Sequence, residues 1–287
     1  MAQIIDGKQI SKTIRRRIAD EVAIMKEKGV VPGLAVIIVG EDPASCVYVR
    51  NKARACEEVG FYSEVIRMDE NTPEDEVVSK IHSLNENPAI HGILVQLPLP
   101  KLLNESRILS AITPSKDVDA FLPENVGKLS LGSAKVLPCT PAGVMTMLQE
   151  SKIDICGKEC VVVGRSNIVG KPMAMMLLAA NGTVTVCHSK TKNLAEITSR
   201  ADILIAAIGK PKFITADMVK PGACVIDVGI NRDSDGKLVG DVDFVNVEPL
   251  ASYITPVPGG VGPMTITTLL QNTLRTASSF LQNKATK

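Results

Sequence analysis

The sequence has few aromatic residues and no tryptophan. Phe, Tyr and Trp make up 3% of its 287 residues, whereas apolar residues make up 45% and charged residues 22%. That balance is normal for a globular protein, so the core must be built from Val, Ile, Leu, Ala and Met. A chain of this length is long for one domain and comfortable for two, and it can bury a large core.

Long runs of one residue class are also missing. No apolar run approaches the roughly 20 residues that a membrane helix needs, and the N-terminus lacks the basic and then apolar segments of a secretory signal. The net charge is +1, and the longest basic run, Arg15–Arg17, is predicted to lie on the solvated face of a helix. We therefore expect a cytoplasmic protein that binds neither nucleic acid nor membranes.

The cysteines do not form a pattern typical of a metal site. The sequence has seven, an odd number, and Cys156 and Cys160 have no His or second Cys pair nearby. Structural zinc usually needs two pairs of ligands, and thiols of cytosolic proteins stay reduced. We expect free thiols, no disulfide framework and no metal.

The first half of the chain alternates between predicted strands and helices. Leu34–Val39 is continuously apolar and ends at Gly40, which is typical of a strand buried on both faces. Thr72 is predicted to cap a helix that has Pro73 in its first turn. The other predicted elements are a helix at Pro43–Val59 and strands that contain Val65–Ile66 and Gly92–Val95.

The second half predicts a parallel sheet with helices on both faces. Its four predicted buried strands are Cys160–Val163, Val184–Cys187, Ile203–Ala206 and Cys224–Val228. The region 111–141 is rich in Pro, Gly and Ser and is predicted to connect two lobes. Apolar spacing between Pro263 and about Leu281 predicts an amphipathic helix that packs back on the first lobe. The fold class is therefore α/β with two lobes.

The turn after Cys160–Val163 has the context of a dinucleotide-binding loop. Gly164 follows the strand, Gly170 follows six residues later, and a helix-like run begins at Met173. Glycine lets the backbone approach a pyrophosphate, and a helix N-terminus attracts its charge. The spacing departs from the usual pattern, because Ser166 replaces the second glycine and the last glycine falls one residue later. An ordinary tight turn is the alternative.

The end of the next strand bears on the choice of cofactor. In NAD enzymes an acidic residue near this point accepts hydrogen bonds from the ribose 2′-hydroxyl. Here Val184–Cys187 is followed by His-Ser-Lys-Thr-Lys, with no acid. A carboxylate would repel a 2′-phosphate, whereas Ser189, Lys190 and Arg165 could bind one. We predict NADP; the alternative is that Lys190 and Lys192 are only solvated loop charges.

Candidate reacting groups occur in three places in the first lobe. Tyr48 and Lys52 are four residues apart and therefore share one helix face. Gln96 follows a predicted strand, at the edge where open parallel sheets bind ligands. Asp117 and Asp119 point the same way if their segment is extended. Each has a structural alternative: a Tyr ring on a Lys stem, a rigid turn, and a helix cap or turn.

A constrained loop precedes the C-terminal helix. Residues 255–265 contain three glycines and three prolines. The glycines allow a ligand to approach the backbone, and the prolines restrict the chain. A ligand loop and a purely structural hinge are both compatible with this composition.

Taken together, these segments resemble the bifunctional methylenetetrahydrofolate dehydrogenase/cyclohydrolase family, in order from about residue 4 to 281. The segments that carry the resemblance are Tyr48–Lys52, Gly92–Pro100, Lys116–Asp119, Pro138–Pro141, Val163–Ser166, Val225–Ile230 and Pro258–Pro263.

The resemblance implies an NADP-dependent enzyme of one-carbon metabolism. Such an enzyme oxidises 5,10-methylenetetrahydrofolate to the 5,10-methenyl form and hydrolyses that to 10-formyltetrahydrofolate. It implies a homodimer whose subunits have two lobes with a cleft between them. The folate-binding, catalytic domain would be residues 1–138, completed by the C-terminal helix at 264–287, and the Rossmann-like NADP domain would be residues 139–263.

The resemblance also implies roles for single residues. Lys52 would be the central catalytic residue, Tyr48 would position the substrate, and Gln96 would hydrogen-bond Lys52. Asp119 would bind the pterin ring, since a carboxylate can accept two parallel hydrogen bonds from its N–H groups. Other folate-site residues would be Val95, Leu97, Pro258, Gly259, Gly260, Val261 and Gly262. The NADP site would contain Gly164, Arg165, Ser166, Ser189 and Ile230.

Two other functions fit parts of the sequence. A dehydrogenase of another small substrate, such as a shikimate-type enzyme, has a similar two-lobe plan, but it would not explain the Pro-Gly-Gly loop. An NADP-sensing binding protein would need no proton-transfer group, so the presence of Lys52, Gln96 and Asp119 together argues against it. Turnover of methylenetetrahydrofolate distinguishes all three.

Overall fold

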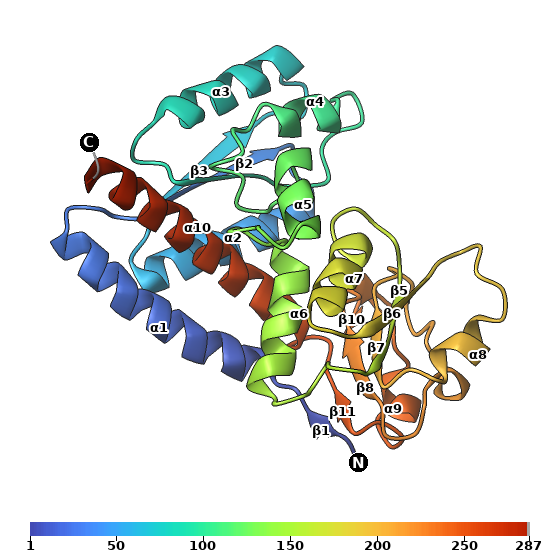
Figure 1. Cartoon of the computed structure of the whole chain (residues 1–287). Helices are drawn as coiled ribbons and strands as arrows, with labels where there is room; N and C mark the ends of the chain where they lie inside the picture. The colour runs from blue at the N-terminus through green and yellow to red at the C-terminus, as the bar shows by residue number, and fades with distance from the viewer. Residues whose placement is uncertain (286–287) are drawn as a thin grey trace. The chain divides into compact units, whose positions relative to one another are not determined.

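The computed structural model describes residues 1–285, which divide into two compact units (Figure 1). The three-stranded unit comprises Thr13–Cys139 and the C-terminal segment from Ile266. The six-stranded unit comprises Met1–Lys12 and Thr140–Thr265. Residues 286 and 287, which we expected in the C-terminal helix, lie outside the described residues.

The three-stranded unit is built on a parallel sheet with the strand order β3–β2–β4. The central strand β2 (Gly33–Val39) is buried along its whole length, as its continuous apolar run predicts. The flanking strands are β3 (Tyr62–Met68) and β4 (Gly92–Val95). The helices are α2 (Pro43–Val59), α3 (Glu74–Glu86), α4 (Glu105–Ser110) and α5 (Pro123–Ser130), with most of α1 (Gly7–Glu27) and of α10 (Val261–Ala285).

Helix α2 has the bounds that the sequence predicts, and local signals explain both ends. The Asp42 carboxylate accepts a hydrogen bond from the Ser45 N–H at 2.8 Å, and Pro43 occupies the first turn. The helix ends at Gly60, whose φ of 78° lies in the left-handed region. Its buried face includes Lys52, so this cationic side chain is directed into the unit.

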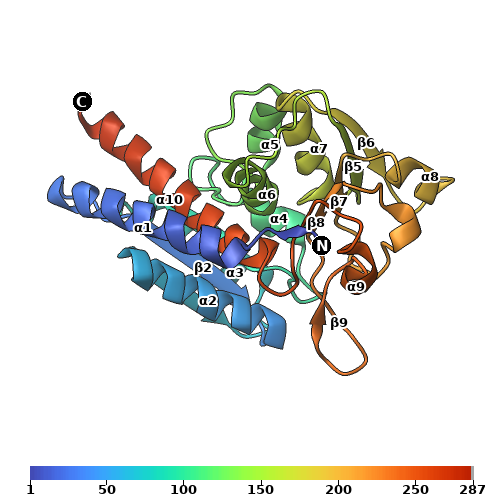
Figure 2. The same cartoon turned by 90° about the horizontal axis from the view of Figure 1, so that it is seen from below.

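Helices cover both faces of the three-stranded sheet. Val77 and Ile81 of α3 pack with Ile37 of β2 in one hydrophobic core, and Figure 1 shows α2 and α10 on the other side of the strands. Helix α10 lies along α1 in both views (Figures 1 and 2), where Nε of Arg15 donates to Oγ1 of Thr267 at 3.1 Å. The C-terminal helix therefore packs back on the first lobe, as predicted.

Two local predictions for this unit are wrong. Thr72 does not cap α3, because the N-cap position is Pro73, which has no side-chain acceptor. The acidic first turn, Glu74–Glu76, interacts favourably with the helix dipole instead. The region 111–141 is more than a connection, since it contains α5 and the start of α6 (Cys139–Glu150). Pro123 in the first turn of α5 is a helix signal that the overall Pro, Gly and Ser content hid.

The six-stranded unit is a parallel sheet with the order β1–β11–β8–β7–β5–β6. Its strands are β1 (Gln3–Ile4), β5 (Glu159–Val163), β6 (Thr183–Cys187), β7 (Ile203–Ala206), β8 (Cys224–Asp227) and β11 (Tyr253–Ile254). Its helical segments are α6, α7 (Gly170–Ala179), α8 (Leu194–Thr198), the 3-10 turn η1 (Ala216–Met218) and α9 (Phe244–Val247). A hairpin of β9 (Asn231–Arg232) and β10 (Leu238–Val239) extends from the sheet (Figure 2).

Three of the four strands predicted for this sheet are buried, and the prediction for the fourth is wrong. Strand β6 lies at the edge of the sheet, where Thr185 and Val186 are exposed. The apolar content of Val184–Cys187 predicted burial. Burial depends on the strand's place in the sheet, which a short segment does not reveal.

The N-terminal residues belong to a different unit from the one that we expected. We assigned residues 1–138 to one domain, but β1 pairs with β11, with Gln3 opposite Tyr253, so residues 1–12 are part of the six-stranded unit. A strand of two residues has no periodicity that the sequence could show.

Other features of the described chain bear on function. The seven cysteines are free thiols. Within residues 1–285 no helix is both long and apolar enough to cross a bilayer. In the same range no three His, Cys, Asp or Glu side chains are grouped to hold a metal ion.

Candidate active site and cofactor site

Lys52 and Gln96 meet within the three-stranded unit. Lys52 is only 7% exposed, and its Nζ donates to Oε1 of Gln96 at 2.9 Å. Gln96 directly follows β4, and its backbone N–H donates to the carbonyl of Ile37 at 2.8 Å. The Gln96 side chain donates from Nε2 to the carbonyl of Leu97 at 2.7 Å. The end of a buried strand and a buried helix face thus bring together two residues that are 44 positions apart.

Burial and the neighbouring charges have opposite effects on the pKa of Lys52. Burial lowers the pKa of Lys52, and the nearby Asp119 carboxylate and Cys139 thiol act against that decrease. Burial raises the pKa of Asp119, while the Lys52 charge and a hydrogen bond from Cys139 act to lower it. Lys52 and Asp119 therefore stabilise each other's charged form in a place where neither would ionise readily alone.

Tyr48 lies on α2 one turn before Lys52. Its side chain is partly buried, and this burial raises the pKa of the phenol. The hydroxyl therefore stays protonated at neutral pH and can donate a hydrogen bond. The alternative of a Tyr ring lying on a surface Lys stem is excluded, because Lys52 is buried.

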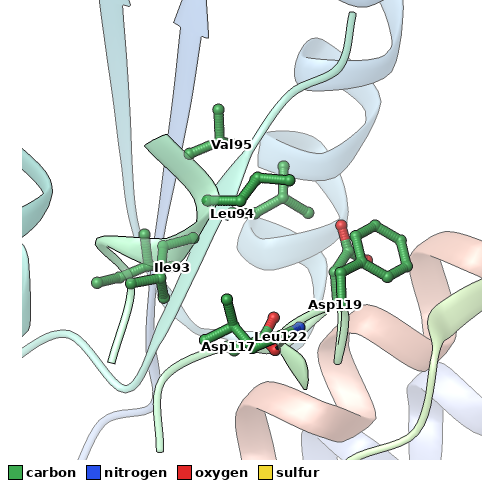
Figure 3. Close-up of a pocket in the computed structure, with 9 residues that line it drawn as sticks. Ile93, Leu94, Val95, Asp117, Asp119 and Leu122 are labelled. Atoms are coloured by element: carbon green, nitrogen blue, oxygen red, sulfur yellow. Dashed lines mark hydrogen bonds between the residues drawn. The ribbon is translucent and has the colours of Figure 1, made fainter. Parts of the chain in front are cut away.

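Asp117 and Asp119 have different environments, although both line one pocket together with Val95 (Figure 3). Oδ2 of Asp117 accepts hydrogen bonds from the Leu122 N–H at 3.0 Å and from Nδ2 of Asn125 at 2.9 Å. Asp117 thus has the structural role of fixing the start of α5, as the alternative of a helix cap or turn predicted. Only Asp119 interacts with Lys52.

Cys139 and Asn272 also belong to this site, although no sequence pattern predicts a role for either. The Cys139 thiol is buried beside Asp119, and burial raises its pKa well above the usual value. Asn272 on α10 is fully buried and donates from Nδ2 to the carbonyls of Val118 at 2.9 Å and Leu137 at 2.7 Å. It therefore ties together the backbone segments that carry Asp119 and Cys139. In the sequence, only the Pro138–Pro141 motif points to Cys139 as a site residue. For Asn272, the only indication is that a polar residue occurs in the apolar stripe of the C-terminal helix.

The six-stranded unit contains the predicted dinucleotide loop between β5 and α7. Gly164 has a φ of 136°, and a Cβ at this position would lie 2.2 Å from the Ala207 carbonyl oxygen. A Cβ at Gly170 would lie 2.3 Å from the Gly164 carbonyl oxygen. Both positions therefore require glycine. Oγ of Ser166 accepts hydrogen bonds from the N–H groups of Val169 at 3.2 Å and Gly170 at 3.3 Å, at the start of α7.

The sheet brings the other predicted cofactor residues to the same edge. Strands β5 and β6 are parallel neighbours, and the Gly164 N–H donates to the Cys187 carbonyl at 2.9 Å. Ser189 lies two residues beyond β6 and Arg165 one residue beyond Gly164, and both are exposed. Ile230 follows β8 and is 48% exposed. A glycine loop at a helix N-terminus, with exposed polar groups and no carboxylate at residues 188–192, fits a phosphorylated dinucleotide.

The predicted site residues therefore fall into two sets. Lys52, Gln96, Asp119 and Tyr48 belong to the three-stranded unit, with Val95 and Leu97. The NADP residues and the loop Pro258–Gly262 belong to the six-stranded unit. In that loop the Gly260 N–H donates to the Pro256 carbonyl at 2.8 Å.

Two family models match the chain. One describes the catalytic domain of tetrahydrofolate dehydrogenase/cyclohydrolase and matches residues 5–119. The other describes the NAD(P)-binding domain of the same enzymes and matches residues 138–281. The chain belongs to the tetrahydrofolate dehydrogenase/cyclohydrolase family. This membership decides against a shikimate-type dehydrogenase.

Individual members of the family are similar over almost the whole chain. The bifunctional protein FolD of Nitrosospira multiformis is 62% identical over 273 residues, covering 95% of each chain. The bifunctional dehydrogenase/cyclohydrolase of Campylobacter jejuni is 51% identical, with a TM-score of 0.95 over 97% of this chain and 99% of that one. The Trypanosoma brucei enzyme, whose structure holds NADP and an inhibitor, is 41% identical, with a TM-score of 0.93 over 97% and 98%.

Proposed function

We propose that this protein oxidises 5,10-methylenetetrahydrofolate to 5,10-methenyltetrahydrofolate with NADP⁺ and then hydrolyses the product to 10-formyltetrahydrofolate. It is a bifunctional, NADP-dependent dehydrogenase and cyclohydrolase. The observation that carries the proposal is the buried Lys52, which is hydrogen-bonded to Gln96 and paired electrostatically with Asp119.

The folate would be held by side chains at the end of β4 and on the segment after it. We assign to Asp119 the recognition of the pterin, whose N–H groups can donate two parallel hydrogen bonds to a carboxylate. Val95 lines the same pocket, and Tyr48 would position the substrate through its protonated hydroxyl. Leu97 and the loop Pro258–Gly262 are further folate contacts that the family resemblance predicts.

The oxidation needs no protein base, because hydride loss from the methylene carbon leaves a methenyl cation. Bound NADP⁺ supplies the hydride acceptor. The task of the protein is to hold both partners in a reactive orientation. We assign cofactor binding to Gly164, Arg165, Ser166, Ser189 and Ile230, because these residues lie at one edge of the sheet.

The hydrolysis requires a water molecule to attack the methenyl carbon. We assign to Lys52 the activation of this water, for which its amine must be neutral. Burial already lowers the pKa of Lys52, and the cation formed in the first step would disfavour the ammonium further. Oxidation of the substrate thus prepares Lys52 for hydrolysis, while Oε1 of Gln96 orients the amine.

We further propose domain roles, a compartment and an oligomeric state. The three-stranded unit would be the folate-binding, catalytic domain and the six-stranded unit the NADP domain, and the enzyme would be a cytoplasmic homodimer. The exposed edge strand β6 offers unpaired backbone groups that a second copy could cover. Light scattering on the eluting protein should give twice the chain mass, and a monomer mass would refute the dimer.

One experiment tests the proposed activity. Purified protein is mixed with 5,10-methylenetetrahydrofolate and either NADP⁺ or NAD⁺, and reduced nicotinamide is followed by absorbance. We expect turnover with NADP⁺, and decay of added methenyltetrahydrofolate in a second assay without nucleotide. Binding of NADP⁺ without any turnover would refute the enzyme and favour an NADP sensor.

A further inference from the structure

Two buried aspartates interlock at the carboxyl ends of β7 and β8. Asp241 is completely buried, and its Oδ2 accepts hydrogen bonds from the backbone N–H groups of Ile208 at 2.6 Å and Gly209 at 3.0 Å. Its Oδ1 accepts from the Lys210 N–H at 2.9 Å and from Nδ2 of Asn231 at 2.8 Å. One carboxylate therefore binds both the loop after β7 and the segment after β8.

Asp227, the last residue of β8, holds Asp241 in place. Its Oδ1 accepts from the N–H groups of Gly229 and Asp241, and its Oδ2 from that of Val242, all at 2.9 Å. Burial raises the pKa of Asp227 to about 7, although the N–H groups of Val242 and Asp241 act to lower it. Burying these two carboxyl groups costs stability unless hydrogen bonds compensate for the lost hydration. Backbone N–H groups and Nδ2 of Asn231 supply that compensation, so the hydrogen bonds of both groups depend on the present positions of the surrounding loops.

Each of the two aspartate side chains packs against a glycine that lies close to the other aspartate in the sequence. A Cβ at Gly229 would lie 2.3 Å from Oδ1 of Asp241, and a Cβ at Gly240 would lie 1.8 Å from Oδ2 of Asp227. Each carboxylate thus occupies the space that a side chain would need next to the other aspartate. This fit leaves the two loops little freedom to move independently.

Both loops held by Asp241 lie at the proposed cofactor site. Ile230, a predicted NADP contact, stands between Gly229 and Asn231, which donate hydrogen bonds to Asp227 and Asp241. The loop that starts at Ile208 follows Ala207, whose carbonyl oxygen would lie 2.2 Å from a Cβ at Gly164 and therefore faces the cofactor loop closely. A shift of that loop would therefore displace the phosphate-binding turn.

We propose that Asp241 is a positioning residue for the dinucleotide, which sets the spacing between the loop 208–210 and Ile230. The inference rests on the proposed function, because it assumes that this edge of the sheet binds NADP. The cyclohydrolase step needs no nucleotide and depends on Lys52 of the three-stranded unit. Loss of Asp241 should therefore separate the two activities.

The test compares Asp241→Asn with the parent enzyme. The amide would face backbone donors with an NH₂ group, so at least one of the hydrogen bonds to the loop 208–210 or to Asn231 is lost. We expect the KM for NADP⁺ to rise by about tenfold, the effect of about 1.4 kcal/mol, with a smaller change in kcat. The rate at which the variant hydrolyses added methenyltetrahydrofolate should stay within about twofold of the parental rate. This activity depends on Lys52, whose surroundings the substitution leaves intact.

Asp233→Asn is the matched control. This aspartate also accepts backbone hydrogen bonds, from Asp235 at 3.0 Å and Lys237 at 2.9 Å, but it does so within the β9–β10 hairpin. Its replacement should leave the KM for NADP⁺ unchanged. A milder variant, Asn231→Ala, removes one hydrogen bond to Asp241 and should raise this KM by less than Asp241→Asn does.

The outcomes are distinguishable. An unchanged KM for NADP⁺ in Asp241→Asn, or an equal loss of both activities in both Asp241→Asn and Asn231→Ala, overturns the inference. If Asp241→Asn does not fold, Asn231→Ala decides, and a parental KM then overturns it. Absence of NADP⁺ reduction by the parent enzyme would instead refute the proposed function itself.

Discussion

Gln96 presents its carbonyl oxygen, and not its amide nitrogen, to Lys52. The assignment follows from the second hydrogen bond of the side chain, since Nε2 donates at 2.7 Å to the Leu97 carbonyl, which can only accept. Oε1 must then face Nζ of Lys52. A neutral acceptor can bind either the ammonium or the amine form of lysine, so Gln96 orients Lys52 without fixing its protonation state.

Gln96→Glu should shift the pH dependence of the cyclohydrolase to higher pH. A carboxylate next to Nζ stabilises the ammonium and raises the pKa of Lys52, against the lowering caused by burial. The neutral amine, which we propose activates water, then forms only at higher pH. The measurement is the rate of methenyltetrahydrofolate hydrolysis as a function of pH, with the rising limb displaced to the alkaline side.

Asp119→Asn should shift the pH dependence of the cyclohydrolase in the opposite direction and serves as a control for Gln96→Glu. It removes a charge that raises the pKa of Lys52, so the rising limb should move to lower pH, together with a higher KM for folate. If both variants left the limb where it is in the parent, Lys52 would not be the group whose titration controls hydrolysis.

Lys52→Met should abolish most cyclohydrolase activity and leave NADP⁺ binding intact. General-base catalysis contributes about 10²–10⁴-fold, and we expect a loss in that range. The affinity for the reduced cofactor NADPH, measured by the change in its nicotinamide fluorescence on binding, should not change, because the proposed cofactor residues belong to the six-stranded unit. Lys128→Met, at an exposed salt bridge with Glu124, serves as the control. Hydrolysis at the parental rate in Lys52→Met would disprove the role of Lys52.

The sequence predicted those elements whose signals are local. Helix α2 has both its predicted bounds because Asp42, Pro43 and Gly60 mark its ends, and β2 and β4 were evident from apolar runs. The cofactor loop could be predicted because strand, glycine turn and helix are consecutive. The grouping of Lys52 with Gln96 and Asp119 came from the family resemblance, since spacing alone is equally compatible with a Tyr ring on a Lys stem.

Features that depend on contacts between distant segments were not predictable. The two-residue strand β1 owes its place to β11, and the exposure of β6 follows from its position at the sheet edge. Asn272 acts through Val118 and Leu137, which are more than 130 residues away. Nothing in the neighbourhood of such a residue in the sequence distinguishes it from an ordinary polar position on a helix.

Gly7→Ala should destabilise the six-stranded unit and weaken folate binding. A Cβ at Gly7 would lie 1.8 Å from the carbonyl oxygen of Gly260, which is a backbone atom and cannot rotate away. Overpacking of this kind costs about 1–3 kcal/mol. Because the displaced loop is the predicted folate contact Pro258–Gly262, the KM for folate should rise while the melting temperature falls.

Gly127→Ala is the control for that prediction. Gly127 lies within α5, and a Cβ built there would meet no atom within 4 Å outside the neighbouring backbone of that helix, so alanine should be neutral or should stabilise the helix by up to about 1 kcal/mol. Equal melting temperatures for Gly7→Ala and the parent would show that the loop moves at no cost and that its conformation is not fixed by α1.

Asn272→Leu should lower both the stability and the folate affinity. Leucine cannot donate, so the carbonyls of Val118 and Leu137 lose their hydrogen bonds to this side chain, although the Val118 carbonyl keeps its contact with the Cys139 thiol. Each lost hydrogen bond costs about 0.5–1.5 kcal/mol, which a fall in the melting temperature should reveal. The Val118 carbonyl is adjacent to Asp119, so the KM for folate should also increase.

The control for Asn272→Leu is Thr276→Val, four residues later on the same helix. Thr276 is 6% exposed, and its hydroxyl donates only to the Thr273 carbonyl within α10 at 2.9 Å. This variant loses a hydrogen bond of similar burial without touching the segments next to Asp119. Its KM for folate should equal that of the parent. If Asn272→Leu lost stability but kept the parental KM, Asn272 would support α10 alone, and the position of Asp119 would be fixed by the start of α5 through Asp117.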